Sequence, residues 1–251
     1  MSHTPTQNRW VHPAPVNSNQ TVRLFCFPYA GGGASIYRNW AQQLPESVHV
    51  CPVQLPGREN RLSEPPYSQV APLVRILAEQ MKPFFDLPFV FFGYSMGALI
   101  AYELTRELRR SNGALPARLF LAAHRAPHRP MRREAIYHLD DEGFKQGLRH
   151  LDGTPDEVLA NDELMDIMLP RLRADFTLYE TYLHEPEGPL SVPFSVFGGT
   201  QDKDIRQEDL DGWGELSDAP LNLRMIDGNH FFIHTAEAAV LNHLVDDIKA
   251  L

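Results

Sequence analysis

Residues 88–104 read PFVFFGYSMGALIAYEL, and one serine in this stretch separates two kinds of pattern. The apolar run at 88–94 is continuous, as expected for a strand buried on both faces, and residues 98–110 have the pattern of a helix. The segment between them, GYSMG, matches G-x-S-x-G, in which a sharp strand-to-helix turn exposes a nucleophilic serine. We therefore expect Ser95 to be a nucleophile; a tight turn with a capping serine is the alternative.

Similar apolar runs recur along the chain and alternate with helical stretches. Further strands are predicted at 21–27, 48–55, 117–123, 193–199 and 221–227, and further helices at 70–85 and 236–251. This alternation predicts an α/β fold with a mostly parallel central sheet flanked by helices, in a single domain over residues 1–251. Residues 126–190 contain helical patterns and no strand candidate. They are interpreted as an inserted helical lid, with additional helical packing as the alternative.

The composition fits a folded protein that binds neither nucleic acid nor a membrane. Of the 251 residues, 43% are hydrophobic, and no apolar run approaches the ~18 residues that span a bilayer. The net charge of −9 argues against nucleic-acid binding. Residues 1–19 are polar and proline-rich without the pattern of a signal peptide, so we expect a flexible N-terminal arm. Cys26 and Cys51 lie in apolar runs and are expected to be buried thiols in the cytoplasm.

A nucleophilic serine needs a base, and the base needs an acid that orients it. With a serine in this kind of turn, the acid and then the histidine follow along the chain. His230 lies in IDGNHFF, in a turn after the last predicted strand, and is the expected base, with His234 as a weaker candidate. In FSVFGGTQDKDI, Asp202 is the acid nearer to the strand end and is the expected partner of the base; Asp204 remains open as a rival.

Acyl transfer also needs hydrogen-bond donors for the oxyanion that develops during the reaction. The backbone N–H of Met96, directly after the serine, is one expected donor. The loop FPYAGGGAS at 27–35 is expected to supply the second, because its glycines let the backbone approach a substrate closely. A phosphate-binding loop is the alternative, but neither a G-K-[ST] ending nor a G-x-G-x-x-G spacing is present.

Several motifs together resemble one family: FPYAGGGAS, QLPGRENR, GYSMGALIAYEL, LPRLRADFTLYETY, FGGTQD and GNHFFI. Over nearly the whole chain from about Val22, the sequence resembles the type II thioesterases that accompany polyketide synthases and nonribosomal peptide synthetases in antibiotic biosynthesis. The resemblance implies an α/β-hydrolase fold with a helical lid. It also implies hydrolysis of acyl or aminoacyl groups from the 4′-phosphopantetheine arm of acyl or peptidyl carrier proteins, which removes misprimed or stalled units.

Carried onto this sequence, the resemblance makes Ser95 the nucleophile, Asp202 the acid and His230 the base. The backbone amides of Met96 and Ala30 become the two oxyanion donors. No metal or organic cofactor is implied beyond the arm that the substrate carries, and members of the family are usually monomers. The alternatives are a carboxylester hydrolase or lipase on the same fold and, less favoured, a non-catalytic protein that docks on a synthase.

Several other residues are candidates for contact with the substrate. Tyr29 stands where many relatives have histidine, at the expected mouth of the site. Met165, Met168 and Phe176 of the insert are candidates to line an acyl pocket, with ordinary core packing as the alternative. Arg58 in PGRENR belongs to the family's pattern and is either a loop anchor or a substrate contact.

The stretch HRAPHRPMRR at 124–133 contains four arginines and no acid: Arg125, Arg129, Arg132 and Arg133. Carrier proteins tend to be acidic and this chain is acidic too, so docking has to overcome mutual repulsion. We expect some of these arginines to contact the phosphate of the pantetheine arm or the acidic helix of the carrier protein. A solvated linker with local salt bridges is the alternative.

Overall fold

The structure is a computed structural model that describes residues 8–13, 18–151, 153 and 156–251. At its centre is a six-stranded sheet in which every neighbouring pair of strands is parallel, in the order β2-β1-β3-β4-β5-β6. The strands are β1 (Val22–Phe27), β2 (Val48–Pro52), β3 (Phe89–Tyr94), β4 (Leu119–Ala122), β5 (Phe194–Gly199) and β6 (Asn222–Ile226). Each strand lies within a run that was predicted to be one, so the predicted α/β architecture is confirmed.

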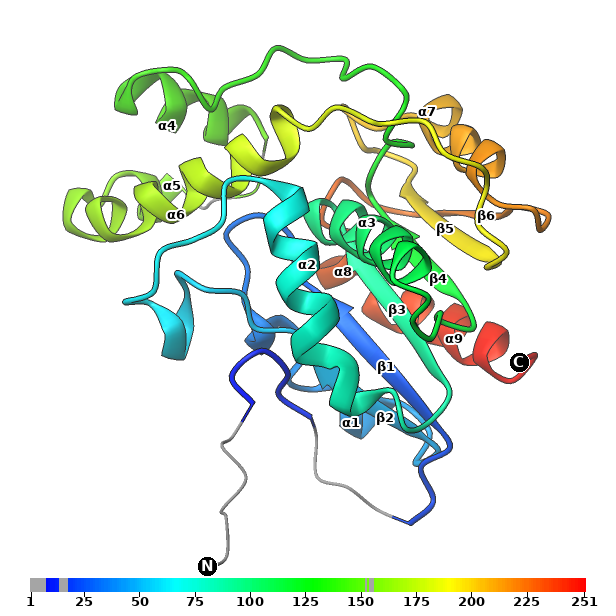
Figure 1. Ribbon diagram of the computed structural model, residues 1–251. Helices are drawn as coiled ribbons and strands as arrows, with labels where there is room; N and C mark the ends of the chain where they lie inside the picture. Colours follow the sequence, from blue (N-terminus) through cyan, green and yellow to red (C-terminus); the bar gives the residue numbers. More distant parts are fainter. Residues whose placement is uncertain (1–7, 14–17, 152, 154–155) are drawn as a thin grey trace, which may run out of the picture.

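Helices cover both faces of the sheet, with α2 and α3 in front of it and α9 behind it in Figure 1. The first face is covered by α2 (Val70–Met81), the 3₁₀ turn η3 (Lys82–Phe84) that continues it, and α3 (Met96–Arg110). The second face is covered by η1 (Ala34–Tyr37), α1 (Trp40–Gln43), α8 (Phe232–Thr235) and α9 (Glu237–Ile248). Three short elements complete this part of the chain: η2 (Glu59–Arg61), α7 (Gln207–Asp211) and η4 (Gly212–Leu216).

The burial of α2 follows from its sequence. Its buried side chains lie at positions 70, 73, 74, 77 and 81, a spacing that puts them on one face of a helix. By contrast, α3 is buried along most of its length, because the sheet, α2 and the segment after the insert all pack around it. The helix that follows Ser95 is therefore a rigid part of the core.

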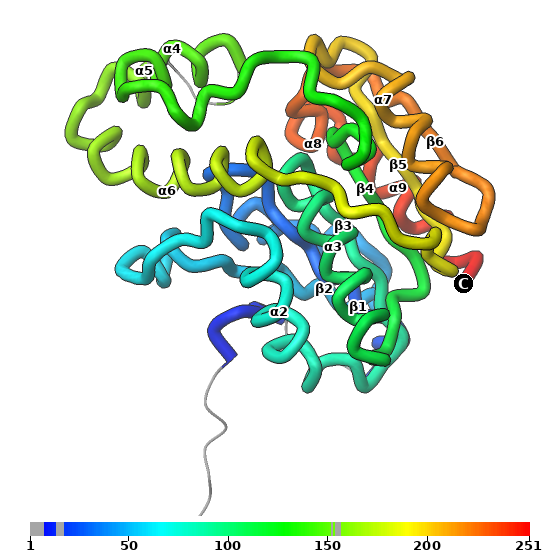
Figure 2. Tube along the Cα trace, turned by 45° about the horizontal axis from the view of Figure 1, so that its top comes forward, coloured from blue at the N-terminus to red at the C-terminus, as the bar shows by residue number. Residues whose placement is uncertain are grey.

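Between β4 and β5 the chain forms the helices of the predicted insert: α4 (Asp141–His150), α5 (Asp156–Leu159) and α6 (Asp162–Glu180). These helices lie together beside one end of the sheet in both views (Figures 1 and 2). They share a hydrophobic cluster of their own, which includes Phe144, Leu148, Met165 and Phe176. The insert therefore has its own small core and is more than a long connecting loop.

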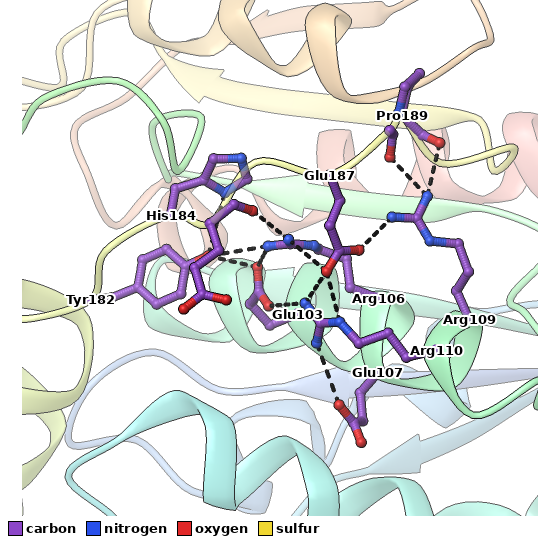
Figure 3. A network of polar contacts seen from close by, with 11 residues as sticks. Glu103, Arg106, Glu107, Arg109, Arg110, Tyr182, His184, Glu187 and Pro189 are labelled. Atoms are coloured by element: carbon purple, nitrogen blue, oxygen red, sulfur yellow. Dashed lines mark hydrogen bonds and ion pairs between the residues drawn. The ribbon is translucent and has the colours of Figure 1, made fainter.

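A network of ion pairs ties the segment between α6 and β5 to α3 (Figure 3). Three arginines of α3 contribute to it: Arg106, Arg109 and Arg110. Glu187 pairs with all three, at 3.1, 2.6 and 2.5 Å respectively. Glu103, which is also on α3, pairs with Arg106 at 2.5 Å and accepts a hydrogen bond from the Tyr182 hydroxyl at 2.6 Å. The exit of the insert is therefore fixed to a helix of the main domain.

Part of the segment expected to be a flexible arm, 1–19, packs on the domain. Trp10 is buried and belongs to the main hydrophobic core, and Val11 forms an antiparallel bridge just after β2. Trp10 and Val11 thus bury apolar surface against the core, whereas in an arm surrounded by solvent this surface would contact water. Residues 1–7 and 14–17 lie outside the described part of the chain, so the flexibility expected there stays a prediction.

Both cysteines, Cys26 and Cys51, are buried free thiols, as expected. Among the described residues, no group of three or more His, Cys, Asp or Glu side chains is arranged so that it could hold a metal ion. In the same part of the chain, no helix combines the length and the apolar character needed to cross a membrane.

Candidate active site

Ser95 lies between the end of β3 and the start of α3, in the sharp turn predicted from GYSMG. Its backbone has φ 52° and ψ −117°, a strained conformation that this kind of turn requires. A Cβ atom on Gly93 would lie 2.2 Å from the carbonyl oxygen of Gly97, and one on Gly97 would lie 2.2 Å from that of Phe27. Both positions must therefore be glycine for β1, β3 and α3 to approach so closely around the serine.

The structure brings Ser95, His230 and Asp202 together in one chain of hydrogen bonds. His230 Nε2 is 3.1 Å from Ser95 Oγ, and His230 Nδ1 is 2.7 Å from Oδ2 of Asp202. Because an ionised carboxylate can only accept, Nδ1 carries the proton and Nε2 can accept from the serine hydroxyl. The Tyr94 hydroxyl donates to the His230 carbonyl oxygen at 2.6 Å, which holds the turn that carries the ring. A histidine held in this tautomer can act as a base toward the serine.

The two candidate acids have different places in this arrangement. The side chain of Asp202 is almost fully buried, and its Oδ1 accepts from the backbone N–H groups of Asp204 and Ile205 at 2.9 and 3.1 Å. Its Oδ2 is thereby aimed at the His230 ring. Asp204 contributes its backbone to this turn, and its side chain lies in the wall of the neighbouring cavity. The carboxylate that orients the ring is therefore that of Asp202.

The weaker candidate base, His234, has a different partner. Its Nε2 lies 2.8 Å from the hydroxyl of Tyr29, and the two rings meet edge to face. Tyr29 also packs against Phe231, the residue after His230. The tyrosine at this position thus braces the histidine-bearing loop from the opposite side of the site.

Two backbone N–H groups beside the serine are available for an oxyanion. Within the residues that the structure describes, neither the Met96 nor the Ala30 N–H donates to a protein acceptor. Met96 is the first residue of α3, so its N–H has no acceptor inside the helix and lies at the positive end of the helix dipole. Ala30 lines the same cavity as Ser95, and the next residue, Gly31, has φ 79°, a conformation that favours glycine.

Arg58 anchors the glycine loop to the insert. Its guanidinium binds the Asp175 carboxylate of α6 through two hydrogen bonds, of 2.7 and 3.0 Å, and both side chains are almost completely buried. The same carboxylate accepts from the Gly31 N–H at 2.7 Å, while Arg58 donates to the Gly32 carbonyl oxygen at 2.9 Å. Of the two roles left open for Arg58, the structure shows the loop anchor.

Asp175 was not identified from the sequence. The usable signal was an acid among the apolar residues of the buried face of α6, between Leu172 and Phe176. A charge at such a position requires a partner, because an unpaired buried carboxylate is costly. The partner is 117 residues away in the chain, so the sequence pattern alone could not name it.

A cavity of about 870 Å³, including its open mouth, lies beside Ser95 and His230. Of the residues expected to bind substrate, Tyr29 and Phe176 line it. Much of the remaining wall is apolar and was not predicted: Met131, Leu148, Leu172, Tyr179 and Phe231. The cavity therefore joins Ser95 to a largely apolar space that can accept an acyl chain.

The two methionines expected in this pocket lie elsewhere. Met165 is fully buried in the hydrophobic cluster of the insert, and Met168 packs against that cluster. The part of α6 that reaches the cavity is farther along the helix, at Leu172 and Phe176. The methionines are therefore core residues of the insert, because they lie on turns of α6 that pack within the insert.

The four arginines between β4 and the insert are not a free patch. Three of them pair with acids of the same chain: Arg129 with Glu215, Arg132 with Glu208 and Asp209, and Arg133 with Glu180. The side chains of Arg129 and Arg132 are 42% and 36% exposed. Arg125, shortly after the end of β4, is buried in the cavity wall, so it is not available to a docking protein.

Comparison with known proteins identifies the family. A family model described as "Thioesterase domain" matches residues 22–250. The chain belongs to the thioesterase family. This thioesterase is 44% identical over 237 residues to the linear gramicidin dehydrogenase LgrE of Brevibacillus parabrevis, covering 93% of this chain and 90% of that protein. It is 40% identical over 242 residues to the gramicidin S biosynthesis protein GrsT of Aneurinibacillus migulanus, covering 96% and 94%.

Among solved structures, this thioesterase is similar to the type II thioesterase BorB from the borrelidin biosynthetic cluster. The TM-score is 0.85 at 31% identity, and the match covers 94% of this chain and 96% of BorB. The predicted resemblance to type II thioesterases and the predicted α/β-hydrolase architecture are thus confirmed. The name of LgrE includes the word dehydrogenase. This sequence lacks the G-x-G-x-x-G spacing that is typical of dinucleotide-binding proteins.

Proposed function

We propose that this thioesterase removes acyl and aminoacyl groups from the 4′-phosphopantetheine arms of carrier proteins, with Ser95 as nucleophile, His230 as base and Asp202 as orienting acid. One observation carries the proposal: these three side chains form a hydrogen-bonded chain at the wall of an apolar cavity. The names of two relatives support the substrate class, since GrsT is a gramicidin S biosynthesis protein and BorB is a type II thioesterase from the borrelidin biosynthetic cluster.

The first half of the reaction forms an acyl-enzyme. His230 Nε2 takes the proton of the Ser95 hydroxyl as Oγ attacks the thioester carbonyl carbon. The resulting oxyanion is stabilised by the N–H groups of Met96 and Ala30, while Asp202 stabilises the imidazolium. The C–S bond then breaks, the imidazolium gives its proton to the sulfur, and the pantetheine thiol leaves.

The second half hydrolyses the acyl-serine. A water molecule takes the place of the thiol, and His230 removes a proton from it as its oxygen attacks the acyl carbon. The same two N–H groups stabilise the second oxyanion, and the C–O bond to Ser95 then breaks. Return of the proton to Oγ restores the enzyme and releases the carboxylic acid. These steps consume only water, so we propose a reaction without a metal or an organic cofactor.

The acyl group occupies the cavity between the insert and the sheet. Tyr29 lies at the nucleophile end, in the loop that carries Ala30, and Phe176 contributes from α6. Apolar walls of this kind favour the hydrocarbon part of an acyl chain, because burying apolar surface is favourable without a matching polar partner. The insert thus serves as the lid of the acyl site in this proposal.

Docking of an acidic carrier protein is proposed at Arg129 and Arg132, the two most exposed arginines of the stretch. Their charges are shared with acids of the same chain, so the contribution of each to docking is modest. Reversing both charges (Arg129→Glu with Arg132→Glu) is expected to lower the ratio of kcat/KM on a loaded carrier to kcat/KM on a small pantetheine thioester. An unchanged ratio would remove the docking site from the proposal.

We also propose that the enzyme works as a monomer in the cytoplasm, alongside the synthase whose carrier proteins it serves. Two buried free thiols are compatible with a reducing compartment. Size-exclusion chromatography with light scattering tests the monomer, and a dimer that persists on dilution would contradict it.

The direct test of the function is intact-mass spectrometry of carrier proteins loaded with acetyl, propionyl or aminoacyl groups. The wild-type enzyme is expected to remove the acyl mass, and Ser95→Ala is expected to leave it in place. Simple esters are assayed in parallel, and faster hydrolysis of these esters would favour a carboxylester hydrolase. A wild-type protein that removes no acyl group and resists a serine-directed covalent probe would be a non-catalytic docking protein.

A further inference from the structure

Among the residues that the structure describes, none forms a hydrogen bond or an ion pair with the guanidinium of Arg125, a buried residue in the wall of the acyl cavity. Arg125 is 9% exposed and lines the same cavity as Ser95 and His230. The other arginines of this cavity, Arg132 and Arg133, both have acidic partners.

The charged and hydroxyl groups nearest to Arg125 are already engaged. The Asp209 carboxylate accepts from Arg132 Nε at 2.6 Å and from the Arg206 backbone N–H at 2.9 Å. The Tyr179 hydroxyl accepts from Arg133 at 2.6 Å. These groups contribute to the electrostatic surroundings of Arg125 without binding it.

Such a cation is costly to bury. Burial lowers the pKa of the Arg125 guanidinium, yet arginine stays protonated in proteins, so the positive charge remains in the cavity. A buried charge that lacks hydrogen-bond partners is retained at the expense of stability. An oxygen acceptor on a bound substrate would supply the missing partner.

The backbone around Arg125 holds the side chain in this position. Ala123, the residue after β4, has φ 53°, which is strained for a residue with a Cβ atom, and it lines the cavity together with His124 and Arg125. His124 Nδ1 lies 2.6 Å from the Arg125 carbonyl oxygen and therefore donates to it, while Trp213 Nε1 donates to the His124 carbonyl oxygen at 2.8 Å. Burial, and then the charge of Arg125, lower the pKa of His124 to about 3, so this ring adds no second charge at neutral pH.

We propose that Arg125 is a specificity-determining residue that binds an oxygen acceptor on the acyl group, beyond the thioester carbonyl. This inference rests on the proposed function, because it places the acyl group of a thioester in the cavity. Acyl groups that carry a carboxylate depend most on Arg125, since a carboxylate can accept two charge-assisted hydrogen bonds from a guanidinium. Acyl groups with a keto oxygen depend on it less, and plain alkanoyl groups do not depend on it.

The acyl group is a better source of this oxygen than the phosphate of the arm. The whole pantetheine chain separates that phosphate from the thioester sulfur. With the thioester carbon at Ser95, we expect the length of the arm to put the phosphate outside the cavity, whereas Arg125 is buried in its wall. A contact between Arg125 and the phosphate is kept as an outcome of the test.

The test compares three acyl groups of nearly equal shape: 3-methylbutanoyl, 3-oxobutanoyl and malonyl. Each is supplied as a thioester of pantetheine and of 4′-phosphopantetheine, and kcat/KM is measured for the wild type, Arg125→Met and Arg125→Lys. Arg38→Met, at an exposed arginine, is the matched control. Arg125→Met is expected to lower kcat/KM for malonyl by about a hundredfold and for 3-oxobutanoyl by about tenfold. The 3-methylbutanoyl substrates should change by less than about threefold, Arg125→Lys should recover part of the malonyl activity, and Arg38→Met should leave all values unchanged.

Two kinetic outcomes would overturn the inference. Equal losses for all three acyl groups would give Arg125 a structural role only. Losses that follow the phosphate of the arm, whatever the acyl group, would assign Arg125 to the arm.

A binding series separates this inference from the proposed function. Kd values of intact malonyl- and 3-methylbutanoyl-pantetheine are measured on Ser95→Ala and on Ser95→Ala with Arg125→Met. If the loss of Arg125 weakens the binding of malonyl-pantetheine alone, the inference is supported, whether or not the wild type hydrolyses these thioesters. If the wild type hydrolyses none of them, the proposed function is refuted. Equal Kd values on the two proteins refute the inference whatever the hydrolysis assay gives. If Arg125→Met does not fold, Arg125→Gln replaces it in both series.

Discussion

Arg58 and Asp175 form a buried ion pair that joins the glycine loop to a helix of the insert. The carboxylate of Asp175 bonds both the guanidinium and the Gly31 backbone N–H, next to the N–H of Ala30 that we assign to the oxyanion. In the proposed mechanism, part of the catalytic geometry thus depends on a residue of the insert.

Replacing Asp175 with asparagine tests this dependence. The change leaves the Arg58 charge buried without a counter-charge and weakens the acceptor for the Gly31 N–H. We expect the free energy of unfolding to fall by about 3 kcal/mol. We also expect kcat/KM to fall by about tenfold to a hundredfold, because the oxyanion loop shifts. Denaturant unfolding and steady-state kinetics on an acyl-pantetheine measure the two effects.

A double variant, Arg58→Met with Asp175→Leu, separates stability from positioning. An apolar pair of similar volume removes both buried charges, so much of the lost stability should return. The Gly31 N–H still lacks its acceptor, so kcat/KM should stay low. Wild-type kcat/KM in the double variant would mean that the ion pair only stabilises the fold.

Asp202 and Asp204 can be distinguished by paired substitutions to asparagine. Asp202→Asn removes the carboxylate that holds the His230 tautomer, so kcat should fall by about a thousandfold or more. Asp204→Asn leaves the backbone N–H that supports Asp202, so kcat should change by less than about tenfold. Both variants are compared on one pantetheine thioester. A larger loss in Asp204→Asn would overturn the assignment of the acid.

The turn around Ser95 is tested by adding one methyl group to Gly97. Its Cβ atom would lie 2.2 Å from a backbone oxygen of β1, which cannot rotate away as a side chain can. We expect Gly97→Ala to lower the free energy of unfolding by about 2–3 kcal/mol, and kcat/KM by about a hundredfold because the serine is displaced. Gly188→Ala is the matched control, since its Cβ atom meets no other atom within 4 Å. Similar effects of the two substitutions would contradict the steric account.

The contacts of Glu187 with three arginines predict that the free energy of unfolding depends on pH. Partial burial would raise the pKa of its carboxyl, but hydrogen bonds from Arg109, Arg110 and Arg106 outweigh this and lower the pKa from 4.5 to about 2. Because the folded pKa lies below the unfolded one, Glu187 contributes stability that is fully present above pH 4.5 and is lost as the pH falls toward 2. The contribution is modest, because the side chain is 29% exposed and is screened by solvent.

The expected signature is a stability difference between wild type and Glu187→Gln that shrinks on acidification. Urea unfolding at pH 6, 4 and 3 measures it. Glu134→Gln, at an exposed glutamate near the start of the insert, is the control and should show no such trend. A difference that stays constant between pH 6 and pH 3 would contradict the effect of the arginines on Glu187.

The features that the sequence predicted correctly are mostly local. Continuous apolar runs predicted the six strands of the sheet, and the glycines around Ser95 predicted the turn. Both predictions succeeded because each pattern depends only on residues close together in the chain. The choice between Asp202 and Asp204 needed coordinates, since it depends on which carboxylate the turn aims at His230. Spacing alone favoured Asp202 without excluding its neighbour.

Other features depend on contacts that no local pattern encodes. The positions of Met165 and Met168 depend on how α6 is rotated and how far along it the cavity begins. The pairing of Arg58 with Asp175 joins residues that are distant in the chain. The packing of Trp10 was not predicted, because this residue lies in a segment whose composition is typical of a disordered arm.

The attachment of the insert has a mechanical consequence. α6 has 19 residues, a length of about 28 Å, and it is clamped near its carboxyl end by Asp175 and by the ion pairs that follow Glu180. A helix fixed near one end is expected to move least near that end, at Asp175, and most at its other end, at Asp162. We expect acyl chains of different length to be accommodated toward α4 and α5, while the distance between Ser95 Oγ and the thioester carbon stays constant.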